Sequence, residues 1–314
     1  MIDYFLRRLG GGILAVLGVF VVSFLIIHLA PGDPTSFMLA SGAPVDNIEQ
    51  LRRAWGLDRP LPVQFWRYLS RLVQGDLGVS IHSGVPVLEL IRERIPLSGI
   101  LALGALLLSV AIGIPIGIIA ALRRDTIFDY GTISVTLLAL STPGYWNGLL
   151  LILLFAVALR WFPVSGTASI SNGIVPYLPH LTLPWLSLSL PTLGMIARLV
   201  RTEMLETLGA DYIRTARSKG LPDRVVVYRH ALRNAMIPVI TVVGLQMGTL
   251  MGGVVFTETV FSLPGLGRLV TRAIVFRDYP IVLGSLVVVA AFVVLINVVT
   301  DFLYTLADPR VRYG

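Results

Sequence analysis

The sequence predicts an all-α polytopic membrane protein with six transmembrane helices and an extracytoplasmic insert after the first helix. Of its 314 residues, 55% are hydrophobic and only 14% are charged, whereas about a quarter of the residues of a soluble domain carry charge. The hydrophobic residues gather in six long runs. About 20 apolar residues in a helix cross a hydrocarbon core of ~30 Å, so these runs predict membrane spans.

The six runs cover residues 13–30, 97–122, 130–159, 181–197, 234–257 and 280–300. None contains Asp, Glu, Lys or Arg, and the fourth is short and interrupted by prolines. Arg7 and Arg8 precede the first run, so a cleaved signal peptide is its alternative interpretation. Its length and the lack of a clear A-x-A site favour a retained span. The glycines at 10–12 favour close approach of another helix.

The third run contains Pro143 and Gly144 near its middle. Irregular backbone at membrane depth is tolerated only where it is buried in protein or lines a cavity. This pair therefore suggests a broken or kinked span beside a cavity, and a simple kink without a role in transport is the alternative.

The placement of Lys and Arg predicts the orientation. With the N-terminus inside, 14 of these residues fall in cytoplasmic segments, and only Arg160, Arg268, Arg272 and Arg277 fall in short outer loops. Both termini are therefore expected in the cytoplasm.

The outer insert, residues 31–97, has helical patterns of its own. Asp46 and Glu49 resemble a capping box that opens a short helix ending at Gly56. Residues 62–73 follow, with Val63, Trp66, Leu69, Leu72 and Val73 on one face and Gly75 as the stop. Residues 86–95 form another amphipathic turn or two before span 2. The insert is either a cap on the outer surface or a docking surface for a protein that delivers substrate.

Several functional classes are excluded by the motifs. The chain has no cysteine, and its four histidines form no metal-binding pattern. A phosphate-binding G-x-x-x-x-G-K-[ST] loop is also absent. The net charge of +7 does not indicate nucleic-acid binding, because the basic residues sit at the ends of apolar runs.

Residues 211–238 form a basic island between two apolar runs, so this segment lies outside the bilayer. Residues 210–219 are rich in helix formers, with Asp211 near the start and basic residues near the end, which suits the helix dipole. Gly220 fits the position after the helix, Pro222 the first turn of the next helix, and Pro238 the start of span 5. A solvated basic loop attracted to anionic lipid is the alternative.

This island resembles the cytoplasmic EAA loop of type I ABC importer permeases, in the form found in the peptide/nickel family. The resemblance lies in DYIRTARSKGL at 211–221 and RHALRNAMIP at 229–238. Further matches are HLAPGDP at 28–34, GLDRP at 56–60, GDLGVS at 75–80, ETVFSLPGLG at 258–267, RDYP at 277–280 and DPR at 308–310. Arg214 and the pair Leu232-Arg233 depart from the general EAA pattern, and the peptide-type branch shares both departures.

The resemblance implies an importer in the bacterial or archaeal cytoplasmic (inner) membrane. Its parts would be two different permeases, two cytoplasmic ATPases that bind ATP and Mg²⁺, and an external binding protein. This chain would be the first permease, without catalytic residues or cofactors. Di- or oligopeptides are the expected substrates, with nickel or another peptide-like solute as the alternative.

The resemblance also assigns a coupling helix that contacts an ATPase. Its residues would be Ala210, Asp211, Tyr212, Arg214, Thr215, Ala216, Arg217, Lys219 and Gly220, with Gly220 as the hinge. Residues 201–236 would form the whole cytoplasmic loop, within a permease core of residues 98–306. Residues 1–30, 31–97 and 307–314 would form the first span, the insert and the cytoplasmic tail.

Glu258 lies 20 residues after Pro238, or roughly 30 Å along a straight helix, and so near the outer face. It is either an interfacial acid that meets water or pairs with Arg268 or Arg272, or a gate at the outer mouth of the path. In the second case Phe261, Pro264 and Gly265 would form the turn that positions the gate.

Polar and small residues in the last two spans suggest a second, different permease as partner. These residues are Gly244, Gln246, Gly248, Gly252, Gly253, Asn297 and Asp301. Polar groups in hydrocarbon are costly unless they are partnered, and small residues allow close packing; contacts within the chain are the alternative. A secondary transporter is the alternative function, and the uncharged centres of the spans argue against it.

Overall fold

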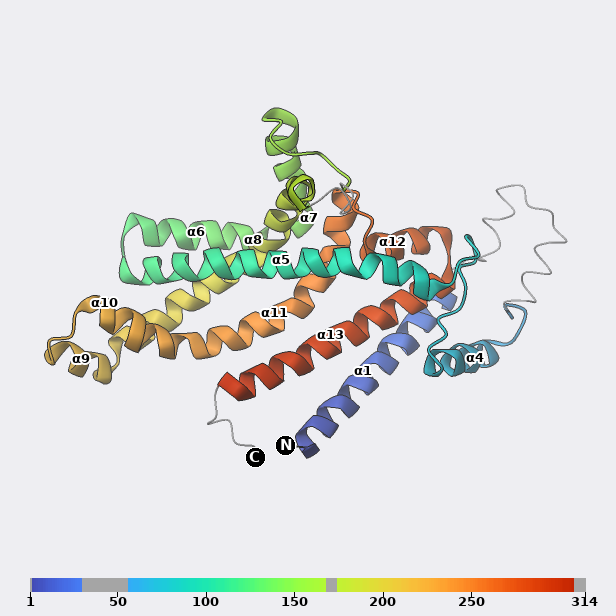
Figure 1. Ribbon diagram of the computed structural model, residues 1–314, viewed down its shortest axis with the longest axis horizontal. Coiled ribbons are helices and arrows are strands. Elements are labelled where there is room, and N and C mark those ends of the chain that lie inside the picture. Colours follow the sequence, from blue (N-terminus) through green and yellow to red (C-terminus); the bar gives the residue numbers. More distant parts are fainter. Residues whose placement is uncertain (1, 30–55, 168–173, 308–314) are drawn as a thin grey trace. The chain divides into compact units, whose positions relative to one another are not determined.

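The computed structural model describes residues 2–29, 56–167 and 174–307, and their regular elements are helices apart from one isolated bridge between Val79 and Pro86 (Figure 1). The predicted helix opened by Asp46 and Glu49 lies outside the described residues. The chain divides into two compact units. Unit 1 comprises Met1–Leu97 and Pro264–Val294, and unit 2 comprises Ser98–Leu263 and Leu295–Gly314. These units do not follow the order of the sequence as the predicted division does, because the segment 264–294 belongs to the same unit as the first span.

Five helices of the described chain are long and apolar enough to cross a membrane. They are α1 (Ile2–Leu29), α5 (Val87–Leu122), α8 (Ile174–Gly209), α11 (Leu232–Val260) and α13 (Tyr279–Ala307). A sixth span is made of α6 (Ile127–Ser141) together with α7 (Gly144–Leu151) and the π-helix η1 (Ile152–Ala158). The two halves meet at 107° across the break before Gly144, which confirms the predicted broken span.

The prediction of a short fourth span was wrong. α8 runs without interruption over 36 residues, with Pro179, Pro184 and Pro191 inside it. More than half of its apolar stretch is buried by neighbouring helices. Packing of this kind holds a helix together where proline removes backbone hydrogen bonds.

In unit 1, α4 (Leu61–Val73) packs against α1 through aromatic rings. Phe65 lies 5.5 Å from Phe20 and 5.4 Å from Phe24, measured between ring centroids. Tyr68 lies on the same side, and its burial raises the pKa of the phenol to about 12, so that the hydroxyl stays protonated. The face predicted for this helix was therefore wrong in part. Val63, Trp66 and Val73 are exposed, because the aromatic residues turn the other face inward.

Two quoted motifs, GDLGVS and RDYP, meet in unit 1. Ser80 donates a hydrogen bond of 2.5 Å from its hydroxyl to Asp278, and the backbone N–H of His82 donates to the same carboxylate. Asp278 precedes the first turn of α13, where Val282 N–H donates to its carbonyl. The acid thereby holds the 76–86 loop on the start of this span.

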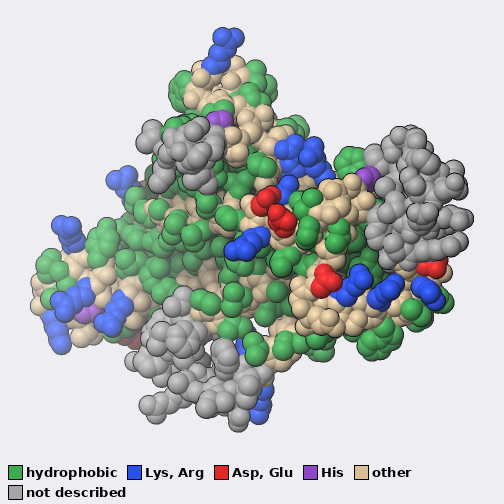
Figure 2. Space-filling model, turned by 45° about the vertical axis from the view of Figure 1, so that its right-hand side comes forward, with side chains coloured by type: hydrophobic (Ala, Val, Ile, Leu, Met, Phe, Trp, Pro, Cys, Tyr) green, Lys and Arg blue, Asp and Glu red, His purple; other side chains and the backbone are tan. Residues whose placement is uncertain are grey.

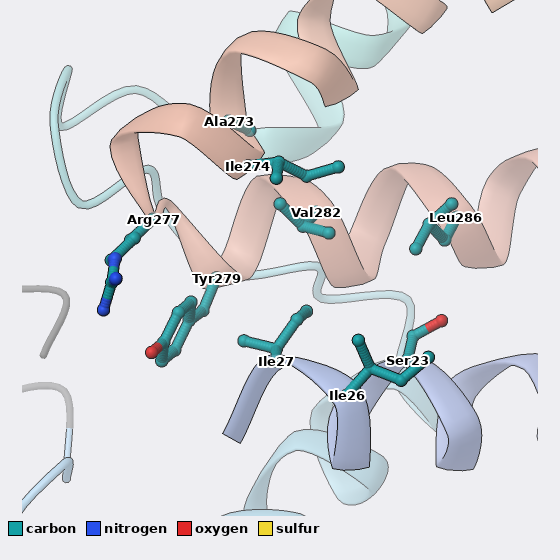
Figure 3. A pocket seen from close by; sticks show the side chains of 9 residues that line it. All are labelled: Ser23, Ile26, Ile27, Ala273, Ile274, Arg277, Tyr279, Val282 and Leu286. Atoms are coloured by element: carbon teal, nitrogen blue, oxygen red, sulfur yellow. The ribbon is translucent and has the colours of Figure 1, made fainter. Parts of the chain in front are cut away.

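A groove of about 360 Å³ also lies in unit 1, between α1, α12 (Leu266–Phe276) and α13 (Figure 3). Its walls are aliphatic, and Arg277 and Tyr279 lie at one end of it. Gly12 of α1 lies against α13, because a Cβ at this position would come within 2.4 Å of Val294. This confirms the predicted close approach at Gly12, whereas Gly10 and Gly11 have open space.

Unit 2 is built around α8. Gly104, Gly113 and Gly117 of α5 face Trp185, Leu193 and Ala197 of α8 in turn, so these two helices run in the same direction. Gly194 of α8 faces Thr136 of α6, and Gly253 of α11 faces Leu188 of α8. Parallel α5 and α8 are what the second and fourth crossings of a six-span chain require.

Hydrophobic side chains cover large parts of the face seen in Figure 2, whereas Lys and Arg gather in separate patches. Leu14, Ile26, Val135 and Leu138 are among many aliphatic residues that are more than half exposed. An apolar surface of this extent is unstable in water. Together with the long helices, it identifies a polytopic membrane protein.

Candidate functional site

The predicted coupling helix is α9 (Asp211–Ser218), with Ala210 as the residue before its first turn. Asp211 lies in the first turn and Arg217 in the last, as the helix dipole favours. Gly220 has φ of +76°, a left-handed conformation that residues with a Cβ adopt at a cost. Its N–H donates to the carbonyl of Arg217 at 2.9 Å and ends the helix.

α9 has one buried and one exposed face. Ile213 and Ala216 are buried in a core with Val226 and Val227. Ala216 therefore anchors the helix and is not available to a partner, unlike the other residues predicted with it. The remaining members from 211 to 220 are exposed, among them Asp211, Tyr212, Arg214, Thr215, Arg217, Lys219 and Gly220. This leaves a rigid polar surface on a short helix between two spans.

The segment after Gly220 differs from its prediction in two ways. Pro222 precedes α10 (Asp223–Val225) and is not in its first turn. Pro238 lies inside α11 and not at the start of a span. The helix continues from α10 through the π-helix η3 (Val226–Ala231) into α11, because the buried face of η3 holds it against α9 and α8.

A pocket of about 350 Å³ lies in unit 2 at the break between α6 and α7. Pro143, Gly144 and Tyr145 line one side, and residues of α8 and α11 line the others. Its polar groups are neutral: hydroxyls of Ser187, Thr192, Thr249 and Thr257, and the phenol of Tyr145. No Asp, Glu, Lys, Arg or His is among the described residues that line it. Such a pocket suits uncharged groups.

Glu258, the candidate gate, is fully buried. Ser98 of α5 donates its hydroxyl to Oε1 of Glu258 at 2.5 Å. The expectation of an interfacial acid that meets water was therefore wrong. Burial at this position follows from the next residues: Phe261 and Leu263 are also buried, and Leu263 N–H donates to the carbonyl of Glu258.

The other residues of the candidate gate are divided between the two units. Phe261 lies in unit 2, where its ring faces Gly148 of α7, at which a Cβ would come within 3.2 Å. Its carbonyl accepts a hydrogen bond from the N–H of Gly166. Pro264 and Gly265 lie in unit 1, and Gly265 caps α12 with an extended backbone.

We expect the hydrogen bond between Ser98 and Glu258 to stabilise unit 2. Ser98→Ala should lower the free energy of unfolding by about 1–3 kcal/mol, because the buried carboxylate loses a donor. The same change in a Glu258→Ala background should cost much less. Ser109→Ala is the control, since this buried hydroxyl of α5 donates only to backbone carbonyls. Thermal unfolding of the parent, the two single variants and the double variant gives the coupling free energy between Ser98 and Glu258. If the effects of the two single changes add within ~0.5 kcal/mol, the hydrogen bond does not stabilise the protein.

Two residues of the predicted set in the last spans, Gln246 and Gly244, have close neighbours inside the chain. Gln246 contacts the sulfur of Met195 in α8, and a Cβ at Gly244 would collide with Thr300 of α13. For these two residues the interpretation by internal contacts is the better one. Gly252 is exposed with open space around it, and the side chain of Asp301 lies outside the described ones.

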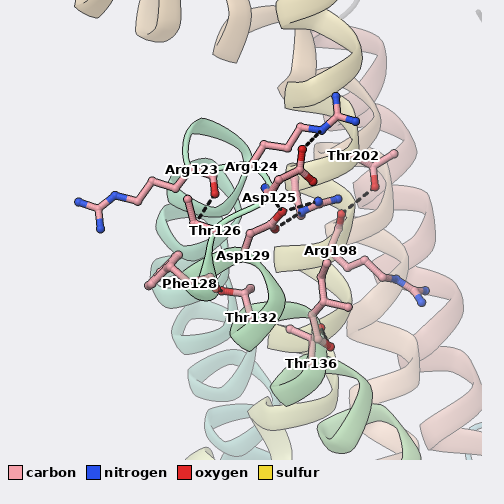
Figure 4. Close-up of polar contacts among 12 residues, drawn as sticks. Arg123, Arg124, Asp125, Thr126, Phe128, Asp129, Thr132, Thr136, Arg198 and Thr202 are labelled. Atoms are coloured by element: carbon pink, nitrogen blue, oxygen red, sulfur yellow. Dashed lines mark hydrogen bonds and ion pairs between the residues drawn. The ribbon is translucent and has the colours of Figure 1, made fainter.

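Sequence reasoning missed Asp129 of α6 and Arg201 of α8, which form a buried ion pair. Figure 4 labels Asp129 and draws its contacts as dashed lines. The available signal was the position of Asp129, an acid one residue before an uncharged run. Arg201 was counted only as a cytoplasmic charge. No group of three or more His, Asp or Glu that could hold a metal ion occurs in the described part of the chain.

Comparisons with known proteins agree with this architecture. Residues 113–313 match the family described as binding-protein-dependent transport system inner membrane component, and residues 1–102 match its N-terminal family. A probable peptide ABC transporter permease protein of Sinorhizobium fredii is 42% identical over 99% of both chains. A putative peptide transport system permease protein of Brucella abortus is 43% identical over 98% of both. The dipeptide transport system permease protein DppB of Escherichia coli is 39% identical over 100% of this chain and 99% of its own. The chain therefore belongs to the family of binding-protein-dependent transport system inner membrane components.

Proposed function

We propose that this chain is one of two permeases of an ATP-driven importer and forms, with the second, a path for di- or oligopeptides delivered by an external binding protein. The observation that carries the proposal is α9, a short polar helix anchored by Ile213 and ended by a left-handed Gly220. The peptide substrate rests on the printed names of the relatives. ATP and Mg²⁺ would bind to partner ATPases, and this chain would be non-catalytic.

The exposed face of α9 supports docking on an ATPase. Arg214 has 77% of its side chain exposed and Arg217 51%, and Lys219 is also exposed. Because Ile213 and Ala216 hold α9 against the start of the next helix, a push on α9 moves α8 and α11 with it. ATP binding to the partner would then shift the equilibrium between two arrangements of the spans.

The pocket at the break between α6 and α7 supports the path. Its neutral hydroxyls and aliphatic walls tolerate different side chains of a peptide, since no buried charge there selects one. Glu258 follows the pocket-lining Thr257 in α11. With Phe261, Pro264 and Gly265 after this helix, it stays the predicted gate. A buried carboxylate in a span is also a feature of secondary transporters, so the test of function must include a proton gradient.

The experiment is uptake of labelled Ala-Ala into liposomes. The chain is reconstituted with its second permease, the two ATPases and the binding protein, and then without the ATPases. We expect uptake only with ATPases and ATP. Uptake by the permeases alone, driven by a pH gradient, would favour the secondary transporter. Uptake of nickel in place of peptide would assign the other branch of the family.

We expect both termini and α9 to face the cytoplasm, from the asymmetry of Lys and Arg. The chain has no cysteine, so single cysteines can be added without a background. A membrane-impermeant maleimide added outside intact cells should label Ser70→Cys in α4 and not Ser218→Cys in α9. Both positions are exposed, which makes them a matched pair. Labelling of Ser218→Cys alone would reverse the orientation.

A further inference from the structure

Asp129 and Arg201 form a two-pronged ion pair between α6 and α8, 72 residues apart in sequence (Figure 4). Arg201 donates from Nε to Oδ1 at 2.5 Å and from Nη2 to Oδ2 at 2.7 Å. The Asp129 side chain is 1% exposed and that of Arg201 20%. Paired donors to one carboxylate fix the orientation of both side chains, which a single contact does not.

The same carboxylate also holds the turn that precedes α6. Its Oδ2 accepts a hydrogen bond of 3.1 Å from the backbone N–H of Asp125, which has a left-handed φ of 60°. Asp125 itself forms an ion pair with Arg124, and both side chains are 65% exposed. Asp129 is therefore the residue that joins this turn, α6 and α8.

A second contact fixes α6 on α8 farther along. A Cβ on Gly194 would come within 3.2 Å of the carbonyl of Thr136, so the two backbones touch there. Thr136 lies seven residues after Asp129, and Gly194 seven residues before Arg201. Seven residues span about 10 Å of helix. Two antiparallel helices fixed at two points this far apart move as one body.

This body links the coupling helix to the pocket. α8 continues from Arg201 to Gly209, about 12 Å of helix, and α9 follows after Ala210. At the other end, α6 stops at Ser141, and Pro143 and Gly144 open α7 and line the pocket. A displacement of α9 therefore reaches the break in the span through α8 and α6.

We propose that Asp129 and Arg201 are positioning residues that transmit movement of α9 to the broken span, so that ATP hydrolysis is converted into opening of the path. The inference rests on the proposed function. Without the ion pair α8 still moves with α9, because they are continuous in the chain. α6 then follows only through the Thr136–Gly194 contact, and the break moves less for each hydrolysis cycle.

The test measures peptide uptake per ATP hydrolysed in the reconstituted complex. Asp129→Asn keeps the shape and removes the charge, and the remaining guanidinium is partly exposed to water. We expect assembled complexes whose ATP hydrolysis is stimulated by the binding protein to within twofold of the parent. Uptake per ATP should fall at least tenfold. The exchange Asp129→Arg with Arg201→Asp should recover part of this loss.

Asp125→Asn is the matched control, since it removes an acid from the same turn whose described ion pair is with Arg124 and not with a residue of α8. It should leave uptake per ATP unchanged. Arg201→Lys is the second variant, because lysine keeps the charge and cannot make the two-pronged contact. It should show the same uncoupling as Asp129→Asn.

Unchanged uptake per ATP in Asp129→Asn and Arg201→Lys would overturn the inference. So would loss of assembly in both variants, because the pair would then serve stability alone. A parent complex without ATP-dependent uptake would instead refute the proposed function, whatever the variants do.

Discussion

Gly117→Val is expected to prevent the chain from accumulating in folded form. A Cβ on Gly117 would come within 2.6 Å of the backbone carbonyl of Ala197 and within 2.7 Å of Val200, both on α8. Real Cβ atoms do not approach so closely, and a backbone carbonyl inside a long helix cannot turn aside. Gly113, one helical turn earlier, is also close to α8, so the two helices would have to separate. Overpacking costs typically 1–3 kcal/mol, and a valine against backbone should lie at or above ~3 kcal/mol.

The matched control for Gly117→Val is Gly99→Val in the same helix, because no atom lies within 4 Å of a Cβ there. Both variants place a β-branched residue in α5, so the difference between them reports the contact with α8. The measurement is the amount of monodisperse protein extracted from membranes, followed by its thermal unfolding. Equal amounts and equal unfolding temperatures of the two variants would contradict the packing of α5 on α8.

Gly220→Val is expected to abolish most transport while leaving the chain folded. Nothing lies within 4 Å of a Cβ at this position, so no clash arises and the cost is conformational. Left-handed backbone costs an ordinary residue roughly 1–2 kcal/mol, and a β-branched one more. The end of α9 would unwind to escape this cost. A loss of 1.4 kcal/mol of binding free energy weakens binding tenfold. The affinity of α9 for the ATPase, and with it uptake, should therefore fall about tenfold or more.

Two variants separate this effect from a general loss of stability. Gly209→Val at the end of α8 also has open space, and its φ is not left-handed, so it should transport nearly as the parent does. Gly220→Asn should be intermediate, since asparagine tolerates the left-handed region better than other residues with a Cβ. Parent-like uptake by Gly220→Val would show that α9 does not depend on the conformation of this residue.

The spans and the short helix before Gly220 were predictable from the sequence because each depends on local chemistry. An uncharged run of membrane length predicts a span, and the break at Pro143–Gly144 was confirmed. Gly220 was also assigned correctly, since a glycine after a basic helical stretch suits a left-handed turn. The same local reasoning failed at Pro238 and the prolines of α8, where packing by neighbours keeps the helices intact.

Contacts between distant segments were beyond sequence reasoning. Asp129 and Arg201 are 72 residues apart, and Ser98 and Glu258 are 160 apart, so no spacing rule connects them. Glu258 was expected near water because a straight helix places it at the outer end of a span. Its burial comes from Ser98 and from the packed turn with Phe261 and Leu263, which only the tertiary structure reveals.

The central claim is that α9 docks on an ATPase, and one crosslinking measurement tests it most directly. Lys219 is the only lysine of the chain, and it is exposed at the end of α9. In the assembled complex, a short amine-reactive crosslinker should join the chain to an ATPase through Lys219, and Lys219→Arg should abolish this product. Peptide mapping separates it from any product of the N-terminal amine, the chain's other reactive amine. Adding Arg59→Lys, on the predicted outer side, to Lys219→Arg should not restore it. A crosslink that survives Lys219→Arg unchanged, or one restored by Arg59→Lys, would contradict docking through α9.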